Sequence, residues 1–260
     1  MNAALAIASV VLKESYRRKD FYVLFVLTAV LTVALGSANF FNDHSIVRYL
    51  KEVCLLFVWI SALLIAITTA ARQIPAEREN RTIFPLLAKP VSRWDVMLGK
   101  FLGAWASCGV ALLMFYTFFI ILSGIREHSW PLAQYFQAAS LHFIFTGIVV
   151  AMILFGSVVF TTPSANATIC FVVIAGILLL GRDLNRIAMT QPSVSGFLLS
   201  MIYYVMPHLE FFDVRDLIIH EAPLIAWWAW AIASLYGFFY MAAFLVLGWI
   251  RFRRLSLQAA

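Results

Sequence analysis

Long apolar runs separated by short polar connections dominate the sequence. A helix needs about 20 mostly apolar residues to cross the hydrocarbon core of a bilayer. One run, Ala167–Gly181, is somewhat short but carries no charged residue. Five others are long enough: Phe21–Phe41, Val53–Ala71, Phe101–Ser123, Leu141–Thr161 and Leu224–Ile250. We therefore predict an all-α integral membrane protein in which a single membrane domain, residues 1–260, crosses the membrane six times.

Two shorter apolar stretches are predicted to be helices that do not span the bilayer. Ala3–Lys19, within residues 1–20, has apolar residues followed by four basic ones, a pattern typical of an amphipathic helix on the inner membrane face. Its apolar residues precede the charges and a full span follows, unlike the order in a cleaved signal peptide. Phe197–Met206, in the outer segment 182–223, has only about ten apolar residues and suits a re-entrant or surface helix.

The positions of the basic residues indicate the orientation. Thirteen of the 19 lysines and arginines fall on the side that holds both termini and the Arg72–Lys100 connection. The positive-inside rule places that side in the cytoplasm. We therefore expect a multi-pass membrane protein with both termini cytoplasmic.

Composition supports the membrane assignment and narrows the function. The chain is 63% hydrophobic and 12% charged, with a mean hydropathy of +0.90. Soluble domains are nearer half apolar and a quarter charged. The composition therefore excludes a soluble domain, a disordered chain and a nucleic-acid-binding protein. The three cysteines, Cys54, Cys108 and Cys170, lie in apolar runs without metal-site spacing and are predicted to be buried.

Charge and motif patterns predict that the chain has no energy source of its own. No span carries an acidic or basic residue near its centre, where ion-coupled transporters usually need one. His142 lies near the end of its span and is predicted to be interfacial or hydrogen-bonded. The nearest string to a phosphate-binding loop, Gly99-Lys100-Phe101, lacks the required glycine spacing and hydroxyl. We predict no catalytic residue, no metal and no cofactor on this chain.

The Arg72–Lys100 connection is the longest polar segment on the cytoplasmic side. Pro75 suits the first position of a short helix, and Glu77 can pair with Arg81 at i,i+4. Pro85 must bend or end that helix. The connection is either a docking element for a cytoplasmic partner or an ordinary solvated loop.

The same connection then prepares the next span. Ser92 followed by Asp95 resembles a capping box, which would begin the helix that continues into the third span.

One string in this connection resembles a known family. Residues 79–93, ENRTIFPLLAKPVSR, followed by Gly99-Lys100, resemble the "E-x-x-x-G/R-T-x-x-x-L-L-x-x-P-V-S-R … G-K" segment of type-2 ABC transporter permeases. Residues 207–213, PHLEFFD, resemble the family's "P-x-x-x-F-F-D" string. In that family a cytoplasmic interfacial helix precedes six spans, a coupling helix follows the second span, and an outer re-entrant hairpin joins the fifth and sixth. The resemblance implies this architecture here, with the coupling segment at residues 72–100.

The resemblance also implies a function. The chain would be the membrane subunit of an ATP-driven exporter, dimeric with a second copy or a paralogue, and surrounded by membrane lipids. ABC ATPase subunits would hold the ATP and Mg, and the cargo would be amphipathic or lipid-linked. The residues predicted to couple to the ATPase are Glu77, Arg78, Glu79, Arg81, Thr82, Ser92 and Arg93. Their alternative role is that of helix caps and surface ion pairs.

Other interpretations stay open. Some relatives serve multicopper enzyme maturation, so the chain is alternatively an ABC-coupled mechanical scaffold that acts on a periplasmic partner. A third possibility is an ATP-independent channel or lipid scramblase. In the outer segment, Asp216 and His220 at i,i+4 can share a helix face. We interpret that segment as an exposed acidic loop rather than a metal site.

Overall fold

The computed structural model of this chain is helical throughout the residues it describes, apart from turns and short extended connections. Those residues are 3–17, 22–23, 26–27, 29–30, 45–80, 91–127, 130–190, 193–220 and 222–254.

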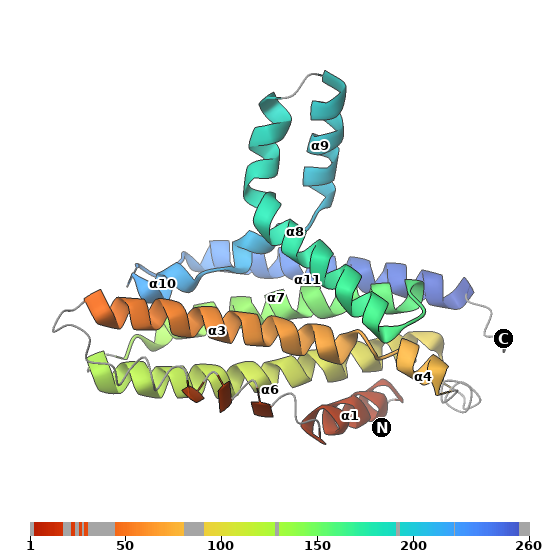
Figure 1. Cartoon of the computed structure of the whole chain (residues 1–260), viewed down its shortest axis with the longest axis horizontal. Coiled ribbons are helices and arrows are strands. Elements are labelled where there is room, and N and C mark those ends of the chain that lie inside the picture. The colour runs from red at the N-terminus through yellow and green to blue at the C-terminus, as the bar shows by residue number, and fades with distance from the viewer. Residues whose placement is uncertain are drawn as a thin grey trace.

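Four long helices run side by side and form the bundle seen in Figure 1: α3 (Ser45–Ala70), α6 (Arg93–Glu127), α7 (Leu132–Val159) and α11 (Trp227–Arg254). Helix α7 is the most enclosed of the long apolar helices, because 83% of its most apolar stretch is buried inside the structure. It contacts α3, α6 and α11 as well as α8 (Pro163–Thr190). A helix that is apolar all round belongs in the interior, because no face of it favours water.

Five helices among the described residues are long and apolar enough to cross a membrane: Lys51–Glu79, Arg93–Ile125, Leu132–Val159, Pro163–Gly181 and Trp227–Arg254. They match five of the six predicted spans. The predicted span Phe21–Phe41 lies largely outside the described residues. The six-span topology therefore stays a prediction.

The last long helix begins later than its apolar pattern predicts. The apolar run starts at Leu224, but α11 starts at Trp227. The side-chain amide of Gln137 on α7 donates to the carbonyl of Ile225 at 2.8 Å and accepts from its N–H at 3.0 Å. Gln137 is fully buried. Because its amide pairs with both backbone groups of Ile225, it holds this connection in an extended conformation.

Helix α8 extends further than predicted and forms a hairpin. It continues past Gly181 to Thr190, and α9 (Ser193–Val205) packs against it. Figure 1 shows the end of α8 and the whole of α9 projecting from the side of the bundle. Tyr240 on α11 donates a hydrogen bond to the carbonyl of Val205 at 3.3 Å, which ties the end of α9 to the bundle. The predicted short helix Phe197–Met206 lies almost wholly within α9, and its insertion into the bilayer stays a prediction.

The N-terminal helix α1 (Ala3–Arg17) packs closely on the beginning of α6. Gly99 and Gly103 make this possible: a Cβ atom at Gly99 would lie 2.6 Å from the carbonyl oxygen of Ala4, and one at Gly103 would lie 2.6 Å from the Cβ of Val11. Glycines four residues apart let two helix backbones approach closely. The predicted interfacial helix is therefore anchored to the bundle by a specific contact.

A buried asparagine joins three helical segments. Asn166 on α8 is fully buried and donates to the carbonyls of Ala71 at 3.0 Å and Ile153 at 3.3 Å. Its oxygen accepts a hydrogen bond from the thiol of Cys170. Cys54, Cys108 and Cys170 are buried, as predicted.

Candidate coupling site

The connection between α3 and α6 lies at one end of the bundle. It contains the short helix α4 (Pro75–Glu79), with Pro75 in the first turn as predicted. In Figure 1, α4 lies at the same end as α1 and the C-terminus of α11. We call this the coupling end: α4, the first two turns of α6 and the last turn of α11.

A buried lysine connects α4 to α6. Lys100 is 2% exposed, and its Nζ donates to Glu77 Oε1 at 2.7 Å and to the carbonyl oxygen of Gln73 at 2.7 Å. An ammonium group is very costly to bury without a partner, because it loses its hydration. The carboxylate and the carbonyl replace that hydration. The position of α4 relative to α6 is therefore set by the ion pair.

Helix α1 also approaches this lysine. Glu14 on α1 interacts favourably with the charge of Lys100. Gly99, the neighbour of Lys100, is one of the two glycines against which α1 packs. Three helices, α1, α4 and α6, therefore converge on one buried ammonium group.

The beginning of α6 carries the predicted capping box. The backbone N–H of Asp95 donates to Ser92 Oγ at 3.1 Å, and the Asp95 carboxylate accepts from the Ser92 N–H at 3.1 Å. The Ser92 hydroxyl donates to the same carboxylate at 2.6 Å. These bonds satisfy backbone donors that a helix N-terminus leaves without partners. The capping box is confirmed, and Ser92 fixes the direction in which α6 starts.

Arg93 binds the end of the last helix. Its Nη1 donates to the carbonyl oxygens of Phe252 and Arg253, the latter at 3.0 Å. Its guanidinium also lies 5.5 Å from the ring centroid of Phe252. The carbonyls at a helix C-terminus have no partners within the helix and carry partial negative charge. Arg93 therefore couples the start of α6 to the end of α11.

The remaining predicted coupling residues differ from Glu77, Ser92 and Arg93 in their exposure or lie outside the described residues. Arg78 is half-buried on α4, and Glu79 is exposed at its last position. Arg81 and Thr82 lie outside the described residues, so the predicted Glu77–Arg81 pair does too. The structure thus brings Glu77 to Lys100 and Arg93 to α11, while Glu79 remains on the surface.

Sequence reasoning missed Lys100 as a site residue. It entered only as the end of the Arg72–Lys100 connection and as part of the Gly99-Lys100 string, with no role assigned to its side chain. The available signal was its setting between Leu98, Gly99, Phe101 and Leu102, since a lysine in an apolar run must find a carboxylate or carbonyl when the helix is packed.

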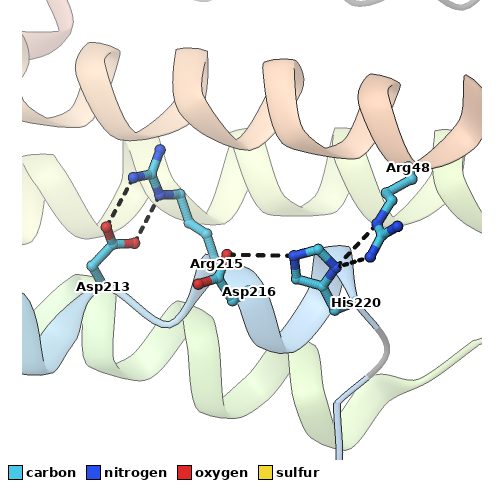
Figure 2. A network of polar contacts seen from close by, with 5 residues as sticks. All are labelled: Arg48, Asp213, Arg215, Asp216 and His220. Atoms are coloured by element: carbon cyan, nitrogen blue, oxygen red, sulfur yellow. Dashed lines mark hydrogen bonds and ion pairs between the residues drawn. The ribbon is translucent and has the colours of Figure 1, made fainter. Parts of the chain in front are cut away.

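The opposite end of the bundle carries a second polar network, shown in Figure 2. Helix α10 (Arg215–Ile219) follows the 3-10 helix η1 (Leu209–Phe212). Arg215 forms a bidentate pair with Asp213, with distances of 2.7 and 2.8 Å, and this hydrogen bonding raises the pKa of Arg215. Arg48 on α3 donates through Nε to His220 Nδ1 at 3.0 Å. We call these contacts the α10 network.

The α10 network includes Asp216 and His220 of the outer segment. Asp216 and His220 do share a helix face, with a distance of 4.0 Å between Oδ1 and Nε2. Within the described parts of the chain, no three His, Cys, Asp or Glu side chains are grouped closely enough to hold a metal ion. His220 attaches the end of α10 to α3 through Arg48.

Long apolar helices form a bundle, and hydrogen bonds and ion pairs connect them at its two ends. This is the architecture of a multi-pass membrane protein. The sequence model of the family described as "ABC-2 family transporter protein" matches residues 5–257, and the chain belongs to that family. It is thus a permease subunit of an ABC transporter, and this class of subunit works with ABC ATPase subunits. No curated protein matches the chain significantly. The subgroup linked to multicopper enzyme maturation stays a prediction.

Proposed function

We propose that the coupling end transmits the movement of the partner ATPase to the membrane helices through the Glu77–Lys100 ion pair. The observation that carries this proposal is the burial of Lys100 against both Glu77 and the carbonyl of Gln73. A force applied to α4 cannot move Glu77 away from Lys100 without leaving a charge buried and unpaired. The force is therefore passed to α6.

Two roles follow for the predicted coupling residues. Glu79 is exposed on α4 and Arg78 is half-buried beside it, so these two contact the ATPase. Glu77, Ser92 and Arg93 act inside the permease. Glu77 transmits to α6, while Ser92 and Arg93 keep α6 and the end of α11 moving as one unit.

The test separates docking from transmission. The tagged permease is extracted gently, and the proteins that co-purify with it are identified and quantified by mass spectrometry. We expect a stoichiometric soluble subunit with a phosphate-binding loop. Glu79→Gln should lower its recovery, because a charge is lost from the docking surface. Lys100→Met should leave recovery unchanged but reduce the change in ATP hydrolysis that the permease causes.

Matched variants control for a general loss of charge. Glu52 is exposed on α3, towards the opposite end of the bundle, so Glu52→Gln should change neither readout. If the permease is recovered alone even after crosslinking, the partner assignment fails. If Lys100→Met alters recovery and hydrolysis together, docking and transmission are not separate. An activity that survives without any ATPase would favour the channel or scramblase alternative.

We further propose that the subunit is a dimeric exporter of the bacterial inner membrane with both termini cytoplasmic. The excess of basic residues on the side of the termini supports this orientation.

The cargo is proposed to be amphipathic or lipid-linked. A groove of about 300 Å³ between α6 and α7 supports this, because its lining is apolar except for the hydroxyls of Tyr116 and Ser140. Both hydroxyls contact protein groups: Tyr116 contacts His142, and Ser140 accepts from Trp230. In nanodiscs, lipid-linked compounds should stimulate ATP hydrolysis by the complex more than water-soluble ones.

A further inference from the structure

A groove of about 800 Å³ lies at the coupling end between the start of α6 and the end of α11. Its lining residues are Ser92, Arg93, Trp94, Val246, Trp249 and Arg253. Both helices are candidate spans: Arg93–Ile125 begins here and Trp227–Arg254 ends here. The groove therefore lies where a span meets the headgroup region of a bilayer.

The groove carries concentrated positive charge. Arg93 and Arg253 line it, and the exposed Arg251 and Arg254 lie in the same last turn of α11. The nearby carboxylate of Asp95 already accepts hydrogen bonds from the N–H and hydroxyl of Ser92. The groove should thus attract an anion, and guanidinium groups suit phosphate oxygens in particular.

The walls of the groove are aromatic and apolar. Trp94 and Trp249 pack edge to face with ring centroids 5.8 Å apart, and the Arg253 guanidinium lies 5.0 Å from the Trp249 ring centroid. Val246 completes the wall one turn before Trp249, and Ile250 beside it is exposed. Tryptophans favour the membrane interface, because one edge is polar and the rest is apolar. A small soluble anion would leave this apolar surface uncovered.

We propose that the groove between α6 and α11 binds the phosphate headgroup of an anionic phospholipid. Arg253 contacts the phosphate, Arg93 contributes charge while it caps α11, and Trp94, Trp249 and Val246 contact the glycerol and upper acyl chains. Basic pockets between transmembrane helices are a known setting for such headgroups. Ser92 and Arg93 also have a part in the coupling proposal, but Glu77, Lys100 and α4 lie outside the groove lining, so a failure of the Glu77–Lys100 proposal leaves the lipid proposal intact.

The experiment uses the full-length permease alone, stripped of lipid in a neutral detergent. It is titrated with dioleoyl phosphatidylglycerol, and retained lipid is counted by native mass spectrometry, with the thermal midpoint as a second readout. Dioleoyl phosphatidylcholine tests the need for negative charge, and inorganic phosphate tests the need for acyl chains. We expect phosphatidylglycerol alone to bind at a saturable site and raise the midpoint.

Two arginines in the same helical turn provide a matched pair. Arg253→Gln should weaken phosphatidylglycerol binding roughly tenfold or more, since hydrogen bonds to a charged group are lost. Arg251→Gln removes the same charge outside the groove lining and should leave binding nearly unchanged. Arg253→Lys should retain part of the affinity. Because both side chains are exposed, neither change should prevent folding.

Three outcomes would overturn the proposal. Equal losses for Arg251→Gln and Arg253→Gln would mean that diffuse charge attracts the lipid. Equal binding of phosphatidylcholine would mean that the headgroup charge is not recognised. Equal stabilisation by inorganic phosphate would mean that the groove holds a soluble anion.

Discussion

The two ends of the bundle use charged residues in different ways. At the coupling end, Lys100 is 2% exposed and its partners are fixed by packing. In the α10 network, the side chain of Asp216 is 86% exposed and that of His220 is 46% exposed. Water reaches both side chains of the second pair, whereas in the first pair the lysine is shielded although the Glu77 side chain is 30% exposed. The same kinds of residue therefore make a fixed connection in the Glu77–Lys100 pair and a weak one in the Asp216–His220 pair.

The difference indicates where mechanical force can be transmitted. A connection that costs several kcal/mol to break moves as one body, whereas an exposed pair separates and re-forms with little loss of free energy. The coupling end has three such fixed connections: Glu77 with Lys100, Arg93 with the end of α11, and α1 with the glycines of α6.

The largest effect is expected for Glu77→Gln. It leaves the Lys100 ammonium buried without a carboxylate, which should cost about 3 kcal/mol or more. Lys100→Met should cost much less, because an apolar side chain of similar length removes the charge itself. Thermal unfolding in detergent measures both. If Lys100→Met is as harmful as Glu77→Gln, the ion pair is a net source of stability and the buried-charge argument is wrong.

A smaller effect is expected where α1 contacts α6. The Cβ of Gly99→Ala would lie 2.6 Å from the backbone oxygen of Ala4, and such overpacking costs about 1–3 kcal/mol. Gly176→Ala on α8 is the control, because nothing lies within 4 Å of its added Cβ. Both changes gain the same helix propensity, so the difference in unfolding free energy isolates the clash. Identical values would show that α1 does not depend on this approach.

A modest effect is expected at the partly buried pair of the α10 network. Asp213→Asn removes the charge that Arg215 binds bidentately, and should cost about 1–2 kcal/mol. The guanidinium of Arg215 also lies 5.4 Å from the ring centroid of Trp59. The fluorescence of a variant that retains Trp59 as its single tryptophan therefore reports whether Arg215 stays in place. A loss as large as that of Glu77→Gln would remove the contrast between the two ends.

The smallest effect is expected for Asp216→Asn. The Asp216 side chain is 86% exposed and lies 4.0 Å from His220, so its loss should change stability by less than about 0.5 kcal/mol. Unfolding at low and high salt provides the check, since an exposed pair is screened. A cost above about 1 kcal/mol would show that the Asp216–His220 pair is also a fixed connection.

Local features followed directly from the sequence. The apolar runs predicted five helices that are now described, because burying backbone hydrogen bonds in lipid requires a continuous apolar helix. Pro75 at the start of α4 and the Ser92–Asp95 capping box were also predictable. Both depend only on backbone geometry within a few residues.

Helix boundaries depended on distant groups. The helical turn predicted before Trp227 is absent because Ile225 pairs through its backbone with Gln137, which lies 88 positions before it in the chain. The apolar pattern at Leu224 and Ile225 suits both a helix and a buried extended strand-like connection, so the pattern alone does not decide between them.

The sequence by itself determined a multi-pass helical membrane protein of the ABC-2 family, with a polar connection before α6. Tertiary structure alone decided that Lys100 binds Glu77, that Arg93 binds the end of α11, and that both arginines of the proposed lipid groove line one surface. Helix periodicity sets which residues share a face, but the partner of a buried charge depends on which helices adjoin. That choice is made by packing between segments far apart in the chain.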